Sequence, residues 1–292
     1  MAAARVSLFV SGVGITDNSG VTQNFVTDTD RRHNQSTITF VGSAAAGDAT
    51  YTNFGAIVQN AFGGHVEFFN TATAGTGTFV IGGGAVQGAS GAGVLFFDAS
   101  SAGSGTFHIN GGAVNGAGFG DVEFINTLTA DRATLIADGG LGGGAGATIF
   151  FFDDSKGGSA NITISGNGNL DLSFHNPPGV TIGSLQGDGL VFLGSDTLAV
   201  NNKSNPLYAG VIADGGFNGG TGGAFVKNGQ GTLDLTGANT YTGGTTINAG
   251  TLLVDNTTGS ATGAGPRAGE VRRLGRRRND RGAGKDRGWH AG

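Results

Sequence analysis

Short apolar segments recur along the chain at an almost constant interval. Four of them begin at Val66, Val94, Val122 and Ile149, and a fifth begins at Ile38, which gives a period of about 28 residues. Each segment has Val or Ile in its first position and Phe in its third, whereas the second position varies between polar and apolar residues. Because neighbouring residues of a β-strand point to opposite faces, this pattern predicts strands that bury their first and third side chains.

A second set of apolar segments has the same period. Its members begin at Thr78, Thr106, Thr134 and Asn161. The last step is slightly shorter than the others, as is the step from Val122 to Ile149, so the two sets belong to the same repeating unit. A constant period with equivalent residues at equivalent positions favours parallel stacking of successive units. Independent hairpins are the alternative architecture, although hairpins need no constant period.

A residue type that tolerates a left-handed backbone closes each strand of the first set. The sequence therefore predicts a corner at this position, which is occupied by Gly42, Asn70, Asp98, Asn126 and Asp153. We expect an all-β fold, a single-stranded right-handed parallel β-helix (solenoid) with coils of about 28 residues. The third-position rings should form an internal stack at the strand spacing of about 4.8 Å. These rings belong to Phe40, Phe68, Phe96, Phe124 and Phe151.

Composition supports this fold and excludes several others. Glycine supplies 60 of the 292 residues, and each glycine costs about 1 kcal/mol in a helix, so long helices are not expected. The chain has no Cys, which excludes disulfides and thiolate metal sites. No apolar run reaches the roughly 18 residues that a transmembrane helix needs. The N-terminus shows no recognisable signal peptide, because its apolar stretch from Val6 to Val10 is too short.

Residues 229–254 read GQGTLDLTGANTYTGGTTINAGTLLV and contain alternating strands separated by glycine turns. This segment resembles the autotransporter-associated β-strand repeat, which recurs in the passenger domains of autotransporters. With the lead-in from Gly183 and the upstream repeats, the broader resemblance covers most of residues 36–260. The resemblance implies a role in passenger export. The residues that carry it are Gly231, Thr232, Leu233, Leu235, Gly237, Asn239, Tyr241, Gly243, Gly244, Thr246, Ile247, Gly250, Thr251, Leu252 and Val254.

Three regions are expected along the chain. Residues 1–35 form an irregular or capping segment, residues 36–265 form the parallel β-helix as a passenger fragment, and residues 266–292 form a basic, disordered tail. The tail holds nine of the sixteen Lys and Arg residues of the chain. With one choice of codons for residues 270–282, a shift of one base gives a Gly-rich string. The tail is therefore a possible frameshift product, which would leave the chain truncated before a translocator barrel.

No arrangement of residues indicates catalysis. The chain lacks nucleophile-elbow, phosphate-loop and His-Glu-x-x-His motifs, and its five His residues show no metal-ligand spacing. Parallel β-helices do include glycan-cleaving enzymes that use paired carboxylates, which makes Asp98 and Asp153 candidates. Asn70 and Asn126 alternate with them at the same corner, which indicates a turn residue. We expect no catalytic, cofactor-binding or metal-binding residues and no enzyme activity; the alternative is a polysaccharide lyase or hydrolase.

The expected function is therefore structural. The chain would serve as a non-catalytic passenger stalk of an autotransporter that is secreted or displayed at the outer membrane, supporting export and adhesion or presentation. Its expected partners are the translocator barrel of the intact parent and a host surface, extracellular matrix or glycan. Contacts with the host would be made through outward loops such as Ala85 to Gly93 or Asp214 to Gly223. Nucleic acid is not expected as a partner, despite the basic tail.

Overall fold

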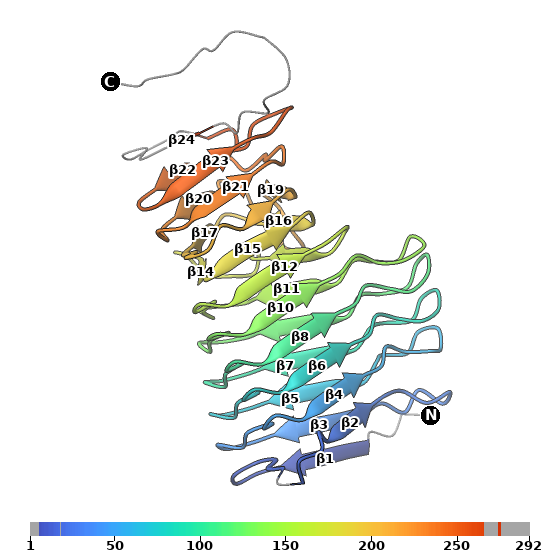
Figure 1. The fold of residues 1–292 in the computed structure, drawn as a ribbon. Coiled ribbons are helices and arrows are strands. Elements are labelled where there is room, and N and C mark those ends of the chain that lie inside the picture. The colour runs from blue at the N-terminus through green and yellow to red at the C-terminus, as the bar shows by residue number, and fades with distance from the viewer. Residues whose placement is uncertain (1–5, 18, 266–273, 276–292) are drawn as a thin grey trace.

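The computed structural model describes residues 6–17, 19–265 and 274–275 of the chain. All pairings between its strands are parallel, and each strand pairs with the equivalent strand of the neighbouring coil (Figure 1). The protein is thus an all-β solenoid. Within the described residues there is no helix with the length and apolar character that crossing a bilayer requires.

Three sheets run along the solenoid. Sheet 1 contains, in spatial order, β1 (Val6–Val10), β3 (Ser36–Phe40), β5 (His65–Phe68), β7 (Gly93–Phe96), β9 (Asp121–Phe124), β11 (Thr148–Phe151), β13 (Asn169–Asp171), β16 (Leu190–Phe192) and β19 (Val211–Ala213). Sheet 2 contains β2 (Asn24–Thr27), β4 (Thr50–Asn53), β6 (Thr78–Ile81), β8 (Thr106–Ile109), β10 (Thr134–Ala137), β12 (Asn161–Ile164), β15 (Ser184–Gly187), β18 (Leu207–Tyr208), β21 (Thr232–Leu235), β23 (Thr251–Val254) and β24 (Leu274–Gly275). Sheet 3 contains β14 (Val180–Ile182), β17 (Thr197–Val200), β20 (Ala224–Lys227) and β22 (Gly244–Ile247).

The register confirms the two sets of repeats. Val66 pairs with Val94 and Phe68 with Phe96 in sheet 1, and Thr78 pairs with Thr106 in sheet 2. In the N-terminal coils the third side of the solenoid has only isolated parallel bridges, which link Gly14, Ala45, Thr73, Ser101, Thr129 and Lys156. Full strands replace these bridges from β14 onward.

The coils shorten at the point where the sequence repeat becomes unrecognisable. Ile149 pairs with Leu170 and Ile162 with Leu185, so these steps are shorter than the step from Val66 to Val94. The two ladders continue without a break through this part of the chain. This confirms the expectation that the solenoid continues with altered turn lengths.

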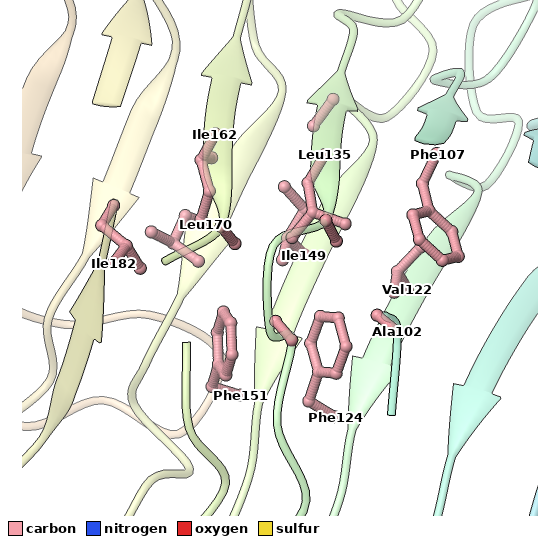
Figure 2. Close-up of a cluster of buried hydrophobic side chains, with 14 of the residues drawn as sticks. Ala102, Phe107, Val122, Phe124, Leu135, Ile149, Phe151, Ile162, Leu170 and Ile182 are labelled. Carbon is pink, nitrogen blue, oxygen red and sulfur yellow. The ribbon is translucent and has the colours of Figure 1, made fainter. Parts of the chain in front are cut away.

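Aromatic rings fill the interior of the N-terminal coils. Successive rings from Phe40 to Phe151 stack with centroid distances of 4.8, 4.7, 5.3 and 4.8 Å, which confirms the stack expected in sheet 1. A parallel stack from sheet 2 meets it edge to face, with Phe96 and Phe107 at 5.9 Å. Figure 2 shows Phe124 and Phe151 in this interior, next to the aliphatic side chains that continue the core towards β14.

The corner after each sheet 1 strand is also as expected. Asn70, Asp98 and Asn126 have φ values of 61°, 61° and 71°. Each side chain caps the preceding coil: the backbone N–H of Asn70 donates to Asp98 Oδ2 at 2.8 Å, and that of Asp98 donates to Asn126 Oδ1 at 3.1 Å. A short acceptor at this position therefore joins coils as well as turning the chain.

Both ends of the solenoid extend past the boundaries expected from the sequence. β1 and β2 lie within residues 1–35, yet they pair in parallel with β3 and β4 as the first coil. The repeat is hard to recognise there because Leu8 takes the place of Val or Ile and Val10 the place of Phe. At the other end, β24 pairs with β23, so the backbone at Leu274 and Gly275 continues sheet 2. The rest of the expected tail, residues 266–273 and 276–292, lies outside the described residues.

Four long loops project from one edge of the N-terminal coils and stack on one another as a flange (residues 54–64, 82–92, 110–120 and 138–147) (Figure 1). Backbone hydrogen bonds continue from loop to loop: Ala85 N–H donates to Ala56 O at 2.9 Å and Ala113 N–H to Gly84 O at 2.9 Å. The loop expected to face outward, Ala85 to Gly93, is part of this flange.

Candidate functional site: the polar contacts between the C-terminal coils

The segment 225–254 forms one and a half coils, from β20 through β23. Its apolar family-repeat residues point inward: Leu233, Leu235, Leu252 and Tyr241 are fully buried, and Ile247 is buried. Thr232, Thr246, Thr251 and Val254 are half-buried. The alternation expected from the sequence is therefore present, and β21 pairs in parallel with β23.

The glycines of the segment allow neighbouring coils to approach closely. A Cβ atom on Gly237 would lie 1.8 Å from Gly210 O, so no side chain fits there. Gly231 and Gly243 are packed in the same way against backbone carbonyls of the neighbouring coil. Gly244 and Gly250 have φ values of 94° and 70°, a left-handed conformation that glycine adopts without strain.

Lys227 is the unusual residue of this interior. Its side chain is fully buried, and it occupies the position that Val200 and Ile247 hold in the adjacent coils. The ammonium donates to Gly229 O of its own coil and, at 3.3 Å, to Ala249 O of the next coil. Burial lowers the pKa of Lys227 to about 8, because the charged form loses its hydration.

Asn239 links three successive coils. Its Oδ1 accepts the Ile212 N–H at 2.8 Å from the coil before, and its Nδ2 donates to Ala261 O at 2.6 Å in the coil after. The residue is buried, so both backbone groups depend on this side chain for their hydrogen bonds. This gives a physical reason for an Asn at this point of the repeat.

Two further side chains make the same kind of contact. Thr245 Oγ1 accepts from the Tyr241 hydroxyl at 2.5 Å and donates to Thr262 O of the next coil at 3.0 Å. Upstream, Asn202 Nδ2 donates to Ser204 O in its own coil and to Thr232 O in the next. We call the side chains of Asn202, Lys227, Asn239 and the Tyr241–Thr245 pair the inter-coil contacts.

Sequence reasoning identified Asn239 and Tyr241 but missed Lys227 and Thr245. The signal for Lys227 was present in Ala224-Phe-Val-Lys227, because a residue two positions after an inward Phe faces inward too. The positive charge of Lys227, however, argued against an inward-facing side chain. Only the structure shows that backbone carbonyls of two coils surround the ammonium.

The two carboxylates considered as candidates for glycan cleavage lie at corners, where they form hydrogen bonds with the backbone. Asp98 and Asp153 lie at positive-φ corners and accept backbone N–H groups of the preceding coil, from Asn70 at 2.8 Å and from Asn126 at 3.0 Å. Within the described part of the chain, no group of three or more His, Asp or Glu side chains is placed to hold a metal ion.

Most of the inter-coil contacts lie in a segment that matches a known protein family. A family model described as the passenger-associated transport repeat matches residues 225–254. The match begins at Phe225 and so includes Lys227, which lies before the segment recognised in the sequence. Together with the solenoid fold, it identifies these residues as an autotransporter passenger-type repeat. No curated protein and no solved structure matches the chain at a significant level.

Proposed function

We propose that this chain, whose residues 225–254 form a passenger-type repeat, is the non-catalytic shaft of a secreted or surface-displayed autotransporter passenger. Its role is to present adhesive surfaces away from the membrane, and the formation of successive coils outside the cell assists export. The observation that carries the proposal is the set of inter-coil contacts within and around the matched segment.

These contacts make coil formation cooperative. A buried amide or ammonium without a partner costs about 1 to 3 kcal/mol, and more when charged. Lys227, Asn239 and Thr245 each complete their hydrogen bonds only when the next coil is in place. Docking of each coil therefore removes a penalty from its neighbour, which favours completed coils over partly formed ones.

Surface display can be tested in cells that express the protein. An epitope inserted at Gln87, an exposed residue of the flange, should be labelled by antibody on unbroken cells. Labelling that requires lysis would contradict the proposal. Release of reducing ends or unsaturated products from polysaccharides by the purified chain would contradict its non-catalytic part.

The contribution of the inter-coil contacts can be tested with a matched pair of variants. Asn239→Ala leaves Ile212 N–H and Ala261 O without partners and should lower both unfolding free energy, by about 1 to 3 kcal/mol, and the amount of protein displayed. Asn201→Ala changes an exposed residue of the same type and should do neither. Equal display of the two variants would remove the link between these contacts and export.

A further inference from the structure

A group of phenylalanines lies on the outer face of sheet 1, separated from the core by the sheet itself. Phe150 points outward from β11, whereas its neighbour Phe151 stacks on Phe124 inside. Phe150 contacts Phe152 at 5.4 Å and Phe174 at 6.3 Å. With Phe119 and Phe217 these rings form what we call the outer aromatic cluster, namely Phe119, Phe150, Phe152, Phe174 and Phe217.

Phe217 lies on the loop that follows β19. We call residues 214–223 the strap. Its base is held by Asp214, which accepts the N–H groups of Gly223 at 2.9 Å and Thr242 at 3.2 Å. Its tip is held by Asp171, a fully buried carboxylate of β13 that accepts the Phe217 N–H at 2.8 Å. The strap thus fixes Phe217 two coils away from β19, the strand that precedes it.

The rings pack into a continuous aromatic surface and do not enclose a space that could hold a cation. Phe217 lies 5.3 Å from Phe150 and 5.7 Å from Phe119, and Phe119 lies 6.2 Å from Phe150. Rings whose centroids lie at these distances are in direct contact, so no space remains between them for a cation. Phe150 is nearly covered, while Phe217 keeps 57% of its surface exposed. The exposed face of Phe217 is therefore the available surface.

A pair of carboxyl groups borders this aromatic surface. Glu123 is the register neighbour of Phe150 in sheet 1, and Asp121 lies two residues from it on the same face. Both are half-buried. Burial raises the pKa of both groups, and the neighbouring Glu123 raises that of Asp121 further, so the pair retains protons to higher pH than isolated acids do. A carboxyl oxygen accepts hydrogen bonds, and a protonated carboxyl also donates one.

The absence of a side chain at Gly93 brings another polar group to this border. A Cβ atom there would lie 2.8 Å from His65 Cδ2 and 3.1 Å from Asp121 Oδ1, so these two side chains converge over the glycine. The exposed ring of Phe217 therefore lies on the same face of sheet 1 as a row of polar side chains.

We propose that the outer aromatic cluster, with Asp121 and Glu123 at its border, binds a neutral glycan chain. The apolar C–H face of a pyranose stacks on Phe217, and the ring hydroxyls exchange hydrogen bonds with the carboxyl pair. The side chains that form this site include no Lys or Arg, so uronic acid residues find no cationic partner there. This assignment rests on the proposed function, since a displayed shaft is what would meet such glycans.

Calorimetric titration of the purified full chain tests the assignment. The probes are two neutral hexasaccharides, cellohexaose and chitohexaose, and the anionic hexagalacturonate. We expect at least one neutral probe to bind and hexagalacturonate to bind more weakly. If neither neutral probe binds, or if hexagalacturonate binds as tightly as the better neutral probe, the assignment is wrong.

Variants separate stacking from packing. Phe217→Leu keeps an apolar side chain on the cluster but removes the ring, and it should weaken binding of the neutral probe about tenfold. Phe217→Trp should retain binding. Phe62→Leu, a control at a flange residue that is 66% exposed, should leave it unchanged. Wild-type affinity in Phe217→Leu would show that the cluster serves packing alone and would overturn the proposal.

The outcomes distinguish this inference from the proposed function. Display of the epitope-tagged protein does not depend on Phe217. If the protein is displayed normally but binds no glycan, only the binding site is contradicted. If it binds glycan but remains inside the cell, only the passenger role is contradicted.

Discussion

Several single residues join neighbouring coils through their side chains. The corner residues Asn70 and Asp98 turn the chain and also cap the coil before them. Asn239 also joins coils, because its side-chain amide forms hydrogen bonds with backbone groups of two other coils. In a solenoid, equivalent positions of successive coils lie next to one another. A short polar side chain at a corner can therefore form a hydrogen bond with the equivalent corner of the adjacent coil.

Replacement at a corner should therefore cost stability on two counts. Asp98→Ala retains a left-handed φ that alanine disfavours and removes the acceptor for Asn70 N–H, so unfolding free energy should fall by about 1 to 2 kcal/mol. Asp98→Asn keeps a residue that tolerates the left-handed φ and also keeps an acceptor oxygen. It should change the unfolding free energy by less than about 0.5 kcal/mol. Urea denaturation compares the two; equal losses would contradict the role assigned to this corner.

The pair Asp121 and Glu123 should make stability depend on pH. Because burial raises the pKa of both carboxyls in the folded state, the stability they contribute is present at low pH and is lost as pH rises through those raised values. Asp121→Asn removes one charge and should stabilise the protein by about 0.5 to 1 kcal/mol at pH 8 but not at pH 4. Thermal unfolding at both pH values measures this. A gain of equal size at pH 4 would exclude like-charge repulsion as its cause.

Lys227 should give the opposite dependence on pH. Its pKa is lowered from 10.5 in the unfolded chain to about 8 in the fold, so its contribution to stability is present above the unfolded value and is lost as pH falls to about 8. Relative to Lys227→Met, the wild-type protein should gain about 1 to 2 kcal/mol between pH 8 and pH 10, since one pKa unit is worth about 1.4 kcal/mol. Denaturation at a series of pH values tests this, and parallel profiles would show that the ammonium is not desolvated.

At the scale of elements, the strands derive their stability from stacked rings more than from strand length. β5, β7 and β9 have four residues each, of which two point inward. The Phe68, Phe96 and Phe124 rings stack at 4.7 and 5.3 Å, and Phe96 also meets the sheet 2 stack edge to face. The Phe96 ring thus contacts rings above, below and beside it.

Truncation of a central ring should be severe. Phe96→Ala leaves a cavity between two rings and should lower unfolding free energy by about 3 to 5 kcal/mol. Phe62→Ala removes a ring that is 66% exposed and should change it by less than about 0.5 kcal/mol. Chemical denaturation of both variants tests this, and a small loss for Phe96→Ala would mean that the interior stack is loosely packed.

At the scale of the whole molecule, each coil pairs its strands only with those of its neighbours, so stability should vary along the axis. Leu8 occupies an inward position in β1 but is 46% exposed, because no described residue forms a coil beyond it. The equivalent Val66, inside the solenoid, is fully buried.

Hydrogen exchange should reveal this gradient. Amides of β1 and β2 should exchange faster than those of β7 to β10, since the inner strands have bonded neighbours on both sides. Deuterium uptake followed by mass spectrometry resolves these peptides. Uniform protection from β1 to β12 would indicate that the solenoid unfolds as a single unit.

The sequence by itself determined the period, the buried faces and the corners, because each is a local property repeated at equivalent positions from Ile38 to Asp153. It also identified most of the matched repeat, whose glycines and alternating leucines are visible in one dimension. Only the tertiary structure decided the contacts that do not repeat. The strap places Phe217 against Phe119, and Lys227 finds carbonyls in two coils. A single contact between distant residues leaves no periodic trace, and burial of an ammonium opposes its intrinsic preference for water, so folding of the whole chain was needed to define both.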